Sequence, residues 1–350
     1  MIPPPRAFLL SITLAECTFF STSILSQNPV PGGAAADSRS VANSFCPGER
    51  FSIKTPPLSS EPYVELTVDG RSGPFLIDFG ATASSVEKGL LATSDGPVTL
   101  AGPQLPNLPA RNRFDVYDRN VVQQGVGDQH GVIGTDFLSK MVVEMRFENA
   151  NDEHLVVSKS CDTSGLGARG FWRFDQKGFF SSNPIGQSHA NVPVLYIDFQ
   201  EGSNGDAIGA KTWAQIDPGY GDAVRPYSID INDAYYEKLV AANAPLVEID
   251  SMRLEDCMGV ERTDRVYVMP GHRLRIEARD GAAMYRHSGF YLVRKGKSSV
   301  RCGGIATIDE PAAQFGASFL RVFGRMIFDP AREAVWVLPT TFQVLVPGTN

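Results

Sequence analysis

The feature that most constrains the fold of this chain is a short pattern that occurs twice. Residues 63–68 alternate apolar and polar side chains and are followed by the turn signal Asp69-Gly70, which predicts a hairpin with the apolar stretch at 75–77. That stretch runs directly into Asp78, and Gly80 follows two positions later in a run of small residues. A second apolar stretch runs into Asp217, and Gly219 again follows two positions later. An isolated aspartate after a strand is usually a turn residue, because its side chain bonds to nearby backbone N–H groups. A second copy of the whole pattern indicates more than a turn.

A different motif follows each copy of the aspartate pattern. Residues 132–138 and 314–320 share the order apolar, Gly, two variable positions, Phe and Leu, with the glycines at Gly134 and Gly316. Each is followed by a β-rich run and then by an acidic residue after a Phe. Two different motifs that occur twice in the same order indicate an internal duplication.

With these motifs the chain resembles the pepsin/retropepsin class of aspartic proteases, in which each half contributes an Asp-Thr/Ser-Gly loop and an apolar-apolar-Gly segment behind it. The resemblance implies a mostly β fold with two aspartic-protease-like lobes, built as duplicated retropepsin-like β-barrels. The lobes would comprise residues 61–160 and 191–340, joined by a connection at 161–190. Strands predicted at 273–279 and 290–293 would form a large hairpin in the second lobe. The 33 glycines and 24 prolines favour the same class, because they suit turns and short strands.

The resemblance assigns catalysis to Asp78 and Asp217, facing each other across the lobe interface. Two adjacent carboxylates cannot both ionise, so one pKa rises while the other falls. The ionised group takes a proton from a bound water, and the protonated group polarises the peptide carbonyl. The implied function is aspartic-type endopeptidase-like hydrolysis of a peptide or protein substrate, without a cofactor. The positions that would support the two loops are Gly80, Gly219, Gly134 and Gly316.

The chain departs from the resemblance directly after each aspartate, where Phe79 and Pro218 replace the expected Thr or Ser. In the family those hydroxyls bond to the opposing loop and lock the two loops together. Pro218 also lacks a backbone N–H. Three outcomes remain open: an active enzyme in which other contacts hold the two loops together, an inactive fold, or an enzyme that catalyses a different reaction. The alternative function is therefore a catalytically inactive fold that acts as a peptide- or protein-binding module.

Charge and composition exclude several other classes of partner. The net charge of −7 and the pI near 5.3 provide no basic footprint for nucleic acid. The five histidines lack the spacing of a metal site, so no metal is expected. No run reaches the roughly 18 apolar residues that a membrane span requires.

The N-terminal residues 1–36 resemble a secretory leader, which would place the protein in the periplasm or outside the cell. Arg6 precedes an apolar run at 7–15, and the alanines at 34–36 offer a small-residue cleavage site. The alternative is a disordered N-terminal tail. Residues 37–60 are predicted to form a linker, since much of this stretch is rich in Pro, Gly, Ala and Ser.

Cysteine usage agrees with export. Removal of the leader would remove Cys17 and leave Cys46, Cys161, Cys257 and Cys302. An even number of cysteines in an exported chain suggests disulfides, and four cysteines allow three pairings. The preferred pairs are Cys46–Cys161 and Cys257–Cys302, because each then closes within one lobe. The alternative is four unrelated buried thiols.

Overall fold

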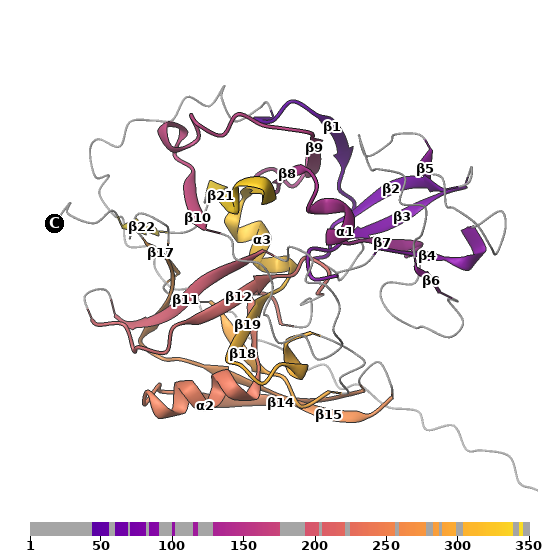
Figure 1. Ribbon diagram of the computed structural model, residues 1–350. Helices are drawn as coiled ribbons and strands as arrows, with labels where there is room; N and C mark the ends of the chain where they lie inside the picture. Colours follow the sequence, from indigo (N-terminus) through magenta and orange to yellow (C-terminus); the bar gives the residue numbers. More distant parts are fainter. Residues whose placement is uncertain are drawn as a thin grey trace, which may run out of the picture. The chain divides into compact units, whose positions relative to one another are not determined.

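The computed structural model describes residues of the unit Ser44–Asn350 (Figure 1). The described residues are 44–55, 60–68, 71–81, 84–90, 100–101, 115–117, 129–175, 193–202, 205–220, 225–255, 259–277, 283–286, 289–298, 304–338 and 343–345. The predicted leader with its cleavage site lies outside them, as do Cys257 and Cys302. Within these residues, none of the helices combines the length and apolar character needed to cross a membrane.

The first aspartate pattern lies in a sheet of six strands with the order β5-β2-β3-β7-β4-β6. The strands are β2 (Tyr63–Val68), β3 (Arg71–Ile77), β4 (Ser85–Glu87), β5 (Leu100–Ala101), β6 (Asp115–Tyr117) and β7 (Gly131–Ile133). β2 and β3 form the antiparallel pair that the alternating apolar pattern predicted, with Tyr63 opposite Leu76. This hairpin delivers Asp78 to the end of β3.

The second aspartate pattern lies in a sheet of ten strands with the order β14-β15-β18-β13-β19-β12-β11-β16-β17-β22. Its strands are β11 (Val194–Glu201), β12 (Thr212–Ile216), β13 (Ser228–Ile231), β14 (Val247–Glu255), β15 (Glu261–Val268), β16 (His272–Glu277), β17 (Ala283–Arg286), β18 (Tyr291–Arg294), β19 (Ala312–Phe315) and β22 (Gln343–Leu345). The predicted hairpin between 273–279 and 290–293 is wrong, because β16 pairs with β11 and β17 whereas β18 pairs with β13 and β15. The long hairpin of this half is β14–β15.

Five strands have the same order in both sheets: β2-β3-β7-β4-β6 corresponds to β11-β12-β19-β13-β18. In each half the strand that leads to the aspartate runs parallel to the strand that leads to the motif glycine. The N–H of Asp78 donates to the carbonyl of Ile133 over 3.0 Å, and the N–H of Asp217 donates to the carbonyl of Phe315 over 3.0 Å. The repeated sequence patterns therefore correspond to a repeated strand arrangement.

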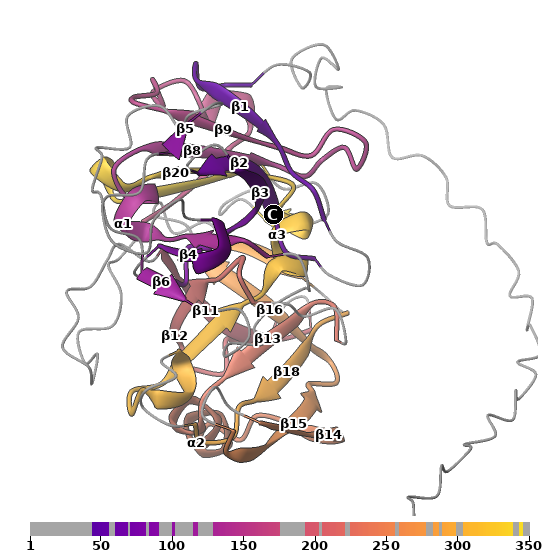
Figure 2. The same cartoon turned by 90° about the vertical axis from the view of Figure 1, so that its right-hand side faces the viewer.

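A third sheet contains strands from both halves, in the order β1-β9-β8-β20-β21-β10. Figure 2 shows β8 of the first half next to β20 of the second. The strands of this sheet are β1 (Glu49–Ser52), β8 (Val142–Arg146), β9 (His154–Ser158), β10 (Trp172–Asp175), β20 (Arg325–Asp329) and β21 (Ala334–Leu338). The strand that follows each motif glycine leaves the sheet of its own half, and β8 pairs with β20. The mostly β class is confirmed. The prediction of duplicated retropepsin-like barrels is wrong, because the described sheets are open and β8 of the first half and β20 of the second half share one sheet.

Helices are few among the described residues, as the glycine and proline content predicted. The α-helices are α1 (Thr135–Leu138), α2 (Asp233–Ala241) and α3 (Ala317–Phe323), and the 3-10 helices are η1 (Lys88–Leu90), η2 (Gly167–Arg169), η4 (Ile305–Thr307) and η5 (Pro330–Arg332). α2 begins after Asn232, whose side chain accepts the N–H of Tyr235, a standard N-cap. α1 and α3 each begin directly after a motif glycine.

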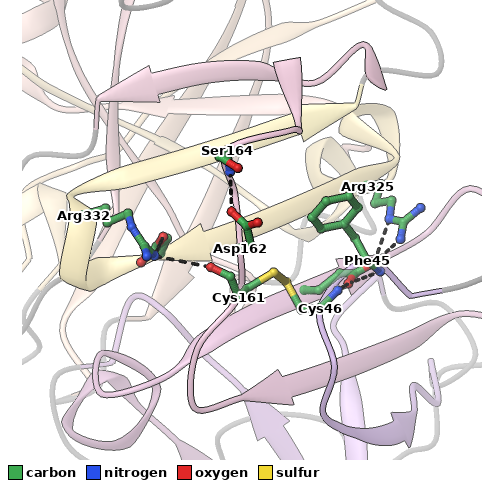
Figure 3. Close-up of a disulfide and its surroundings, with 9 residues drawn as sticks. Phe45, Cys46, Cys161, Asp162, Ser164, Arg325 and Arg332 are labelled. Atoms are coloured by element: carbon green, nitrogen blue, oxygen red, sulfur yellow. Dashed lines mark hydrogen bonds and ion pairs between the residues drawn. A yellow bond between two sulfur atoms is a disulfide. The ribbon is translucent and has the colours of Figure 1, made fainter. Parts of the chain in front are cut away.

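The predicted disulfide Cys46–Cys161 is present and fastens the segment before β1 to the segment after β9 (Figure 3). Both sulfur-bearing residues are buried in a small cluster with Phe171 and Ile327. Next to it, Arg325 of β20 pairs with the fully buried carboxylate of Glu144 on β8, which also accepts the N–H of Cys46 over 2.9 Å. The disulfide and this ion pair both link segments of the sheet that the two halves share.

Candidate functional site

The structure brings Asp78 and Asp217 together, one from the end of β3 and the other from the end of β12. Their carboxyl groups lie close enough together for each to shift the pKa of the other. A Cβ atom added to Gly80 would lie 2.5 Å from Cγ of Asp217, and one added to Gly219 would lie 2.3 Å from Cγ of Asp78. Each glycine therefore packs against the aspartate of the other half, which no residue with a side chain would permit without displacing that carboxyl.

Backbone N–H groups hold the two carboxyls in place. Oδ1 of Asp78 accepts the N–H of Gly80 over 2.6 Å and that of Ala81 over 3.1 Å. Oδ1 of Asp217 accepts the N–H of Gly219 over 3.0 Å. Donors that point at a carboxyl favour its ionised form, so Asp78 is the better stabilised anion of the pair.

The electrostatics of the pair point the same way. Burial raises the pKa of Asp78, while the hydrogen bonds from Asp217 and from Gly80 act to lower it. Burial also raises the pKa of Asp217, to well above its ordinary value, and the charge of Asp78 raises it further. Both residues nevertheless remain partly exposed to solvent. Burial and the charge of Asp78 therefore favour the protonated form of Asp217, while the backbone donors favour the ionised form of Asp78.

The motif glycines lie behind the two turns, buried at the starts of α1 and α3. The residue after Gly134 donates its N–H to the carbonyl of Ala81 over 2.9 Å. The residue after Gly316 donates its N–H to the carbonyl of Tyr220 over 3.1 Å. Ala81 and Tyr220 occupy equivalent positions, three residues after each aspartate, so both turns are held by the same backbone contact.

Phe79 and Pro218 are accommodated by packing rather than by hydroxyl bonds. Phe79 is 1% exposed, and its ring stacks on Phe328 of β20 with the ring centroids 4.2 Å apart. Pro218 is also buried. The two turns therefore contact each other through glycines and carboxyl groups, while the residue after each aspartate packs in the interior.

The sequence motifs did not reveal a serine that links the first turn to α1. Oγ of Ser84 accepts the N–H of Gly134 over 2.8 Å and donates to Oδ1 of Asp136 over 2.7 Å. Ser84 is 1% exposed. A small polar residue in a small-residue run carries no signal of this role, so only the fold could reveal it.

A pair of buried glutamines lies behind Asp217. Gln215 donates from Nε2 to Oε1 of Gln314 over 2.9 Å and to Oδ2 of Asp217 over 3.4 Å. The equivalent positions of the first half, paired in the same register, are Leu76 and Val132. A residue-by-residue comparison of the two repeats would have identified this polar substitution in the sequence. Across the described ranges, no three His, Cys, Asp or Glu side chains gather as a metal site would require.

Comparisons with known proteins returned solved structures but no sequence relatives. Basic 7S globulin from soybean has a TM-score of 0.46 and 10% sequence identity, covering 83% of this chain and 95% of that chain. Conglutin gamma, a basic 7S globulin from lupine seeds, has a TM-score of 0.45 and 9% identity, covering 85% and 95%. No family model and no curated protein matches the sequence.

These comparisons correct the predicted membership in the pepsin/retropepsin class of aspartic proteases. No family model supports a protease assignment, and the matched structures named above are basic 7S globulins. The motifs that suggested the class are short, and the residue after each aspartate breaks both of them. The paired aspartates remain as a feature of the geometry of this chain, without a family assignment.

Proposed function

We propose that this protein is a peptide- or protein-binding module whose binding centre is the Asp78–Asp217 pair. The observation that carries the proposal is the close approach of the two carboxyl groups, each packed against the glycine of the opposite turn, and burial and the charge of Asp78 favour the protonated form of Asp217. A protonated carboxyl offers a donor and an ionised carboxyl offers acceptors. One donor beside one acceptor complements the carbonyl and the N–H of an extended peptide backbone, whose main-chain bonds supply affinity in this mode of recognition.

The surroundings of the pair support binding over catalysis. Hydrolysis requires a water and two carboxyls held to within a fraction of an ångström, and small misplacements cost large factors in rate. Phe79 and Pro218 provide no hydroxyl to link the two turns, and Phe79 packs on Phe328 instead. Binding tolerates a looser arrangement, because each hydrogen bond then contributes independently.

A random decapeptide library tests the proposal. The full chain, with its disulfide intact, is equilibrated with the library from pH 4 to pH 7, and bound peptides are identified by mass spectrometry. We expect peptides to be retained uncleaved, most strongly on the acid side where the pair holds one proton. Replacing both aspartates with alanine should weaken binding roughly 10- to 100-fold, since hydrogen bonds to charged groups contribute about 1.5–3 kcal/mol.

The matched control is Asp136→Asn, a carboxyl of the same half that bonds to Ser84 rather than to Asp217. It should change peptide affinity less than twofold. Equal binding by wild type and by the double alanine variant would contradict the proposal, as would the absence of binding from folded wild type at every pH.

Acid hydrolysis of peptide bonds is the second candidate, and the unequal protonation of the two carboxyls favours it. Asp78 would act as the base toward water and Asp217 as the acid toward the carbonyl. In the same assay, cleaved peptides would appear at acid pH, and both Asp78→Asn and Asp217→Asn would abolish them. Intact peptides after prolonged incubation would exclude this candidate and leave the binding proposal standing.

Export is part of the proposal. The Cys46–Cys161 disulfide supports it, because disulfides persist in oxidising compartments and are rare in the cytosol. Recovery of the disulfide-bonded protein from the periplasm or the medium, with the leader removed, would be the expected result of fractionation. Recovery of the intact chain with free thiols from the cytosol would contradict it.

A further inference from the structure

A buried charged cluster lies beside the second aspartate turn, built from residues that belong to no motif. Lys295, which follows β18, is 7% exposed. Its Nζ lies 3.2 Å from a carboxylate oxygen of Asp230 on β13 and 3.2 Å from one of Asp264 on β15, and both aspartates are fully buried. Burying three charges is costly, and a cluster of this kind is weak evidence for stability alone. A further role therefore has to be considered.

Tyr220 connects the cluster to Asp217. Its hydroxyl accepts from Nζ of Lys295 over 3.4 Å, and the same ammonium lies 4.5 Å from the centroid of its ring. The backbone N–H of Tyr220 donates to the carbonyl of Asp217 over 3.3 Å, and its carbonyl accepts the N–H of Ala317. The side chain of Tyr220 is thus held by Lys295, while its backbone closes the turn that carries Asp217.

Among the described residues, the charged groups that act on the Asp217 turn come from neighbouring elements. Asp217 faces Asp78 from the first half and Asp230 from β13. Within the cluster, Asp264 also faces Arg262, whose Nε lies 3.5 Å from Oδ1, and accepts the N–H of Gly296 over 2.9 Å. In the first half the position equivalent to Tyr220 is Ala81, which makes the same backbone contact without a side chain that could reach a charged cluster.

We propose that Lys295, with Asp230 and Asp264, is a positioning residue for Asp217: it anchors Tyr220 and thereby holds the Asp217 turn against Asp78. The proposal rests on the proposed function only in taking the Asp78–Asp217 pair as the functional centre. Loosening the anchor lets the Asp217 carboxyl separate from Asp78 and gain solvent, so that the pair releases its shared proton at lower pH.

The test follows the carboxyl carbons of ¹³C-labelled aspartates by NMR as the full chain is titrated. The double variant Asp264→Asn/Lys295→Met removes one charge of each sign and keeps Asp230, whose charge acts directly on the pKa of Asp217. The matched control, Glu144→Gln/Arg325→Met, neutralises another buried ion pair, on β8 and β20. We expect the upper titration midpoint of the Asp78–Asp217 pair to fall by one pH unit or more in the first variant and by less than 0.3 unit in the control, a tenfold against a twofold change in proton affinity.

Tyr220→Phe is the second, milder variant, since it removes only the hydroxyl that Lys295 holds. It should lower the same midpoint by about 0.3–0.5 unit, with Tyr267→Phe as a control in the same half. If the double variant fails to fold, Tyr220→Phe decides the question alone. An unchanged midpoint in Tyr220→Phe, or equal displacements in the double variant and the Glu144/Arg325 control, would overturn the proposal. Because no peptide is present, this outcome is independent of whether the pair binds peptides.

Discussion

The turn that carries Asp78 and the turn that carries Asp217 share their backbone hydrogen bonds but differ in the side chains that surround them. In both, the aspartate N–H bonds to the neighbouring parallel strand, and the glycine two positions later donates to Oδ1. Behind Asp78 lie Leu76 and Val132, whereas the equivalent positions behind Asp217 are polar. Backbone geometry therefore pairs the two carboxyls, while both the number of backbone donors and the surrounding side chains make the pair unequal.

Within the pair, the environment favours the ionised form of Asp78 and the protonated form of Asp217. Asp78 receives N–H donors from Gly80 and Ala81, which favour its anion. The pKa of Asp217 is raised most by burial, then by the charge of Asp78, and to a smaller extent by the charge of Asp230. A proton shared by the pair is therefore assigned to the second half. The following substitutions make the two halves more alike or less alike, and are ordered by the size of the expected effect.

The largest expected difference is between Phe79→Thr and Pro218→Thr, which introduce the same residue at equivalent positions. Phe79→Thr removes a buried ring stacked on Phe328 and should cost about 3 kcal/mol or more of unfolding free energy. Pro218→Thr mainly releases a fixed backbone angle and should cost about 1 kcal/mol or less. Chemical denaturation of both variants measures the difference, and equal costs would show that Phe79 has no special packing role.

The two glycines that touch the opposite aspartates give the next effect. Gly80→Ala and Gly219→Ala each place a Cβ within 2.5 Å of a carboxyl carbon. Each should therefore separate the carboxyls and cost about 1–3 kcal/mol, the usual range for overpacking. Gly165→Ala is the control, because a Cβ there meets nothing within 4 Å. Calorimetric melting compares the three variants; a loss confined to one half would mean that the mutual contact is not symmetric.

Stability should depend on pH through the second half in particular. The pKa of Asp217 is raised above its ordinary 3.8, so the folded protein keeps a proton that the unfolded chain has released. The stabilising contribution of Asp217 is therefore complete below about pH 3.8 and is lost as the pH rises through the folded pKa of the pair. Asp217→Asn should flatten the curve of unfolding free energy against pH in that window.

His154 contributes to the pH dependence of the unfolding free energy in the opposite sense. Burial lowers the pKa of His154 from 6.5, so protonation of its ring destabilises the fold as pH falls below that value. His154 is unchanged in Asp217→Asn, so the difference between the wild-type and variant curves isolates Asp217. A constant difference across the acid range would show that Asp217 titrates alike in the folded and unfolded chains.

Features carried by local pattern were predictable from the sequence. The alternation in Tyr63–Val68 and the apolar approach to Asp78 predicted the β2–β3 hairpin, and the repeated order of motifs predicted that Asp78 and Asp217 are equivalent. The disulfide pairing also followed, from the expectation that each half closes on itself. The hairpin depends on residues close in sequence and the equivalence of the aspartates on a pattern that occurs twice, whereas the disulfide joins residues 115 positions apart and followed from the division of the chain into halves.

Features that depend on non-local pairing were not predictable. The predicted barrels fail because β8 and β20 pair with each other, and nothing in either strand specifies its partner. The buried position of Lys295 was not predictable for a similar reason, because lysine is almost never fully buried and its two partners lie on other strands. The family prediction failed where it relied on short motifs, since Phe79 and Pro218 already departed from them.

The smallest expected effect comes from making the second half resemble the first behind its aspartate. Gln215→Leu alone leaves the side chain of Gln314 without its partner and should cost about 1–3 kcal/mol, the penalty for an unsatisfied buried amide. The double variant Gln215→Leu/Gln314→Val copies Leu76 and Val132 and should be within about 1 kcal/mol of wild type, because both polar partners are then replaced. A double-mutant cycle, completed with Gln314→Val alone, measures this coupling. If the double variant costs as much as the sum of the single variants, the two amides do not act as a pair, and the polar contrast between the halves lies in the Gln215–Asp217 contact instead.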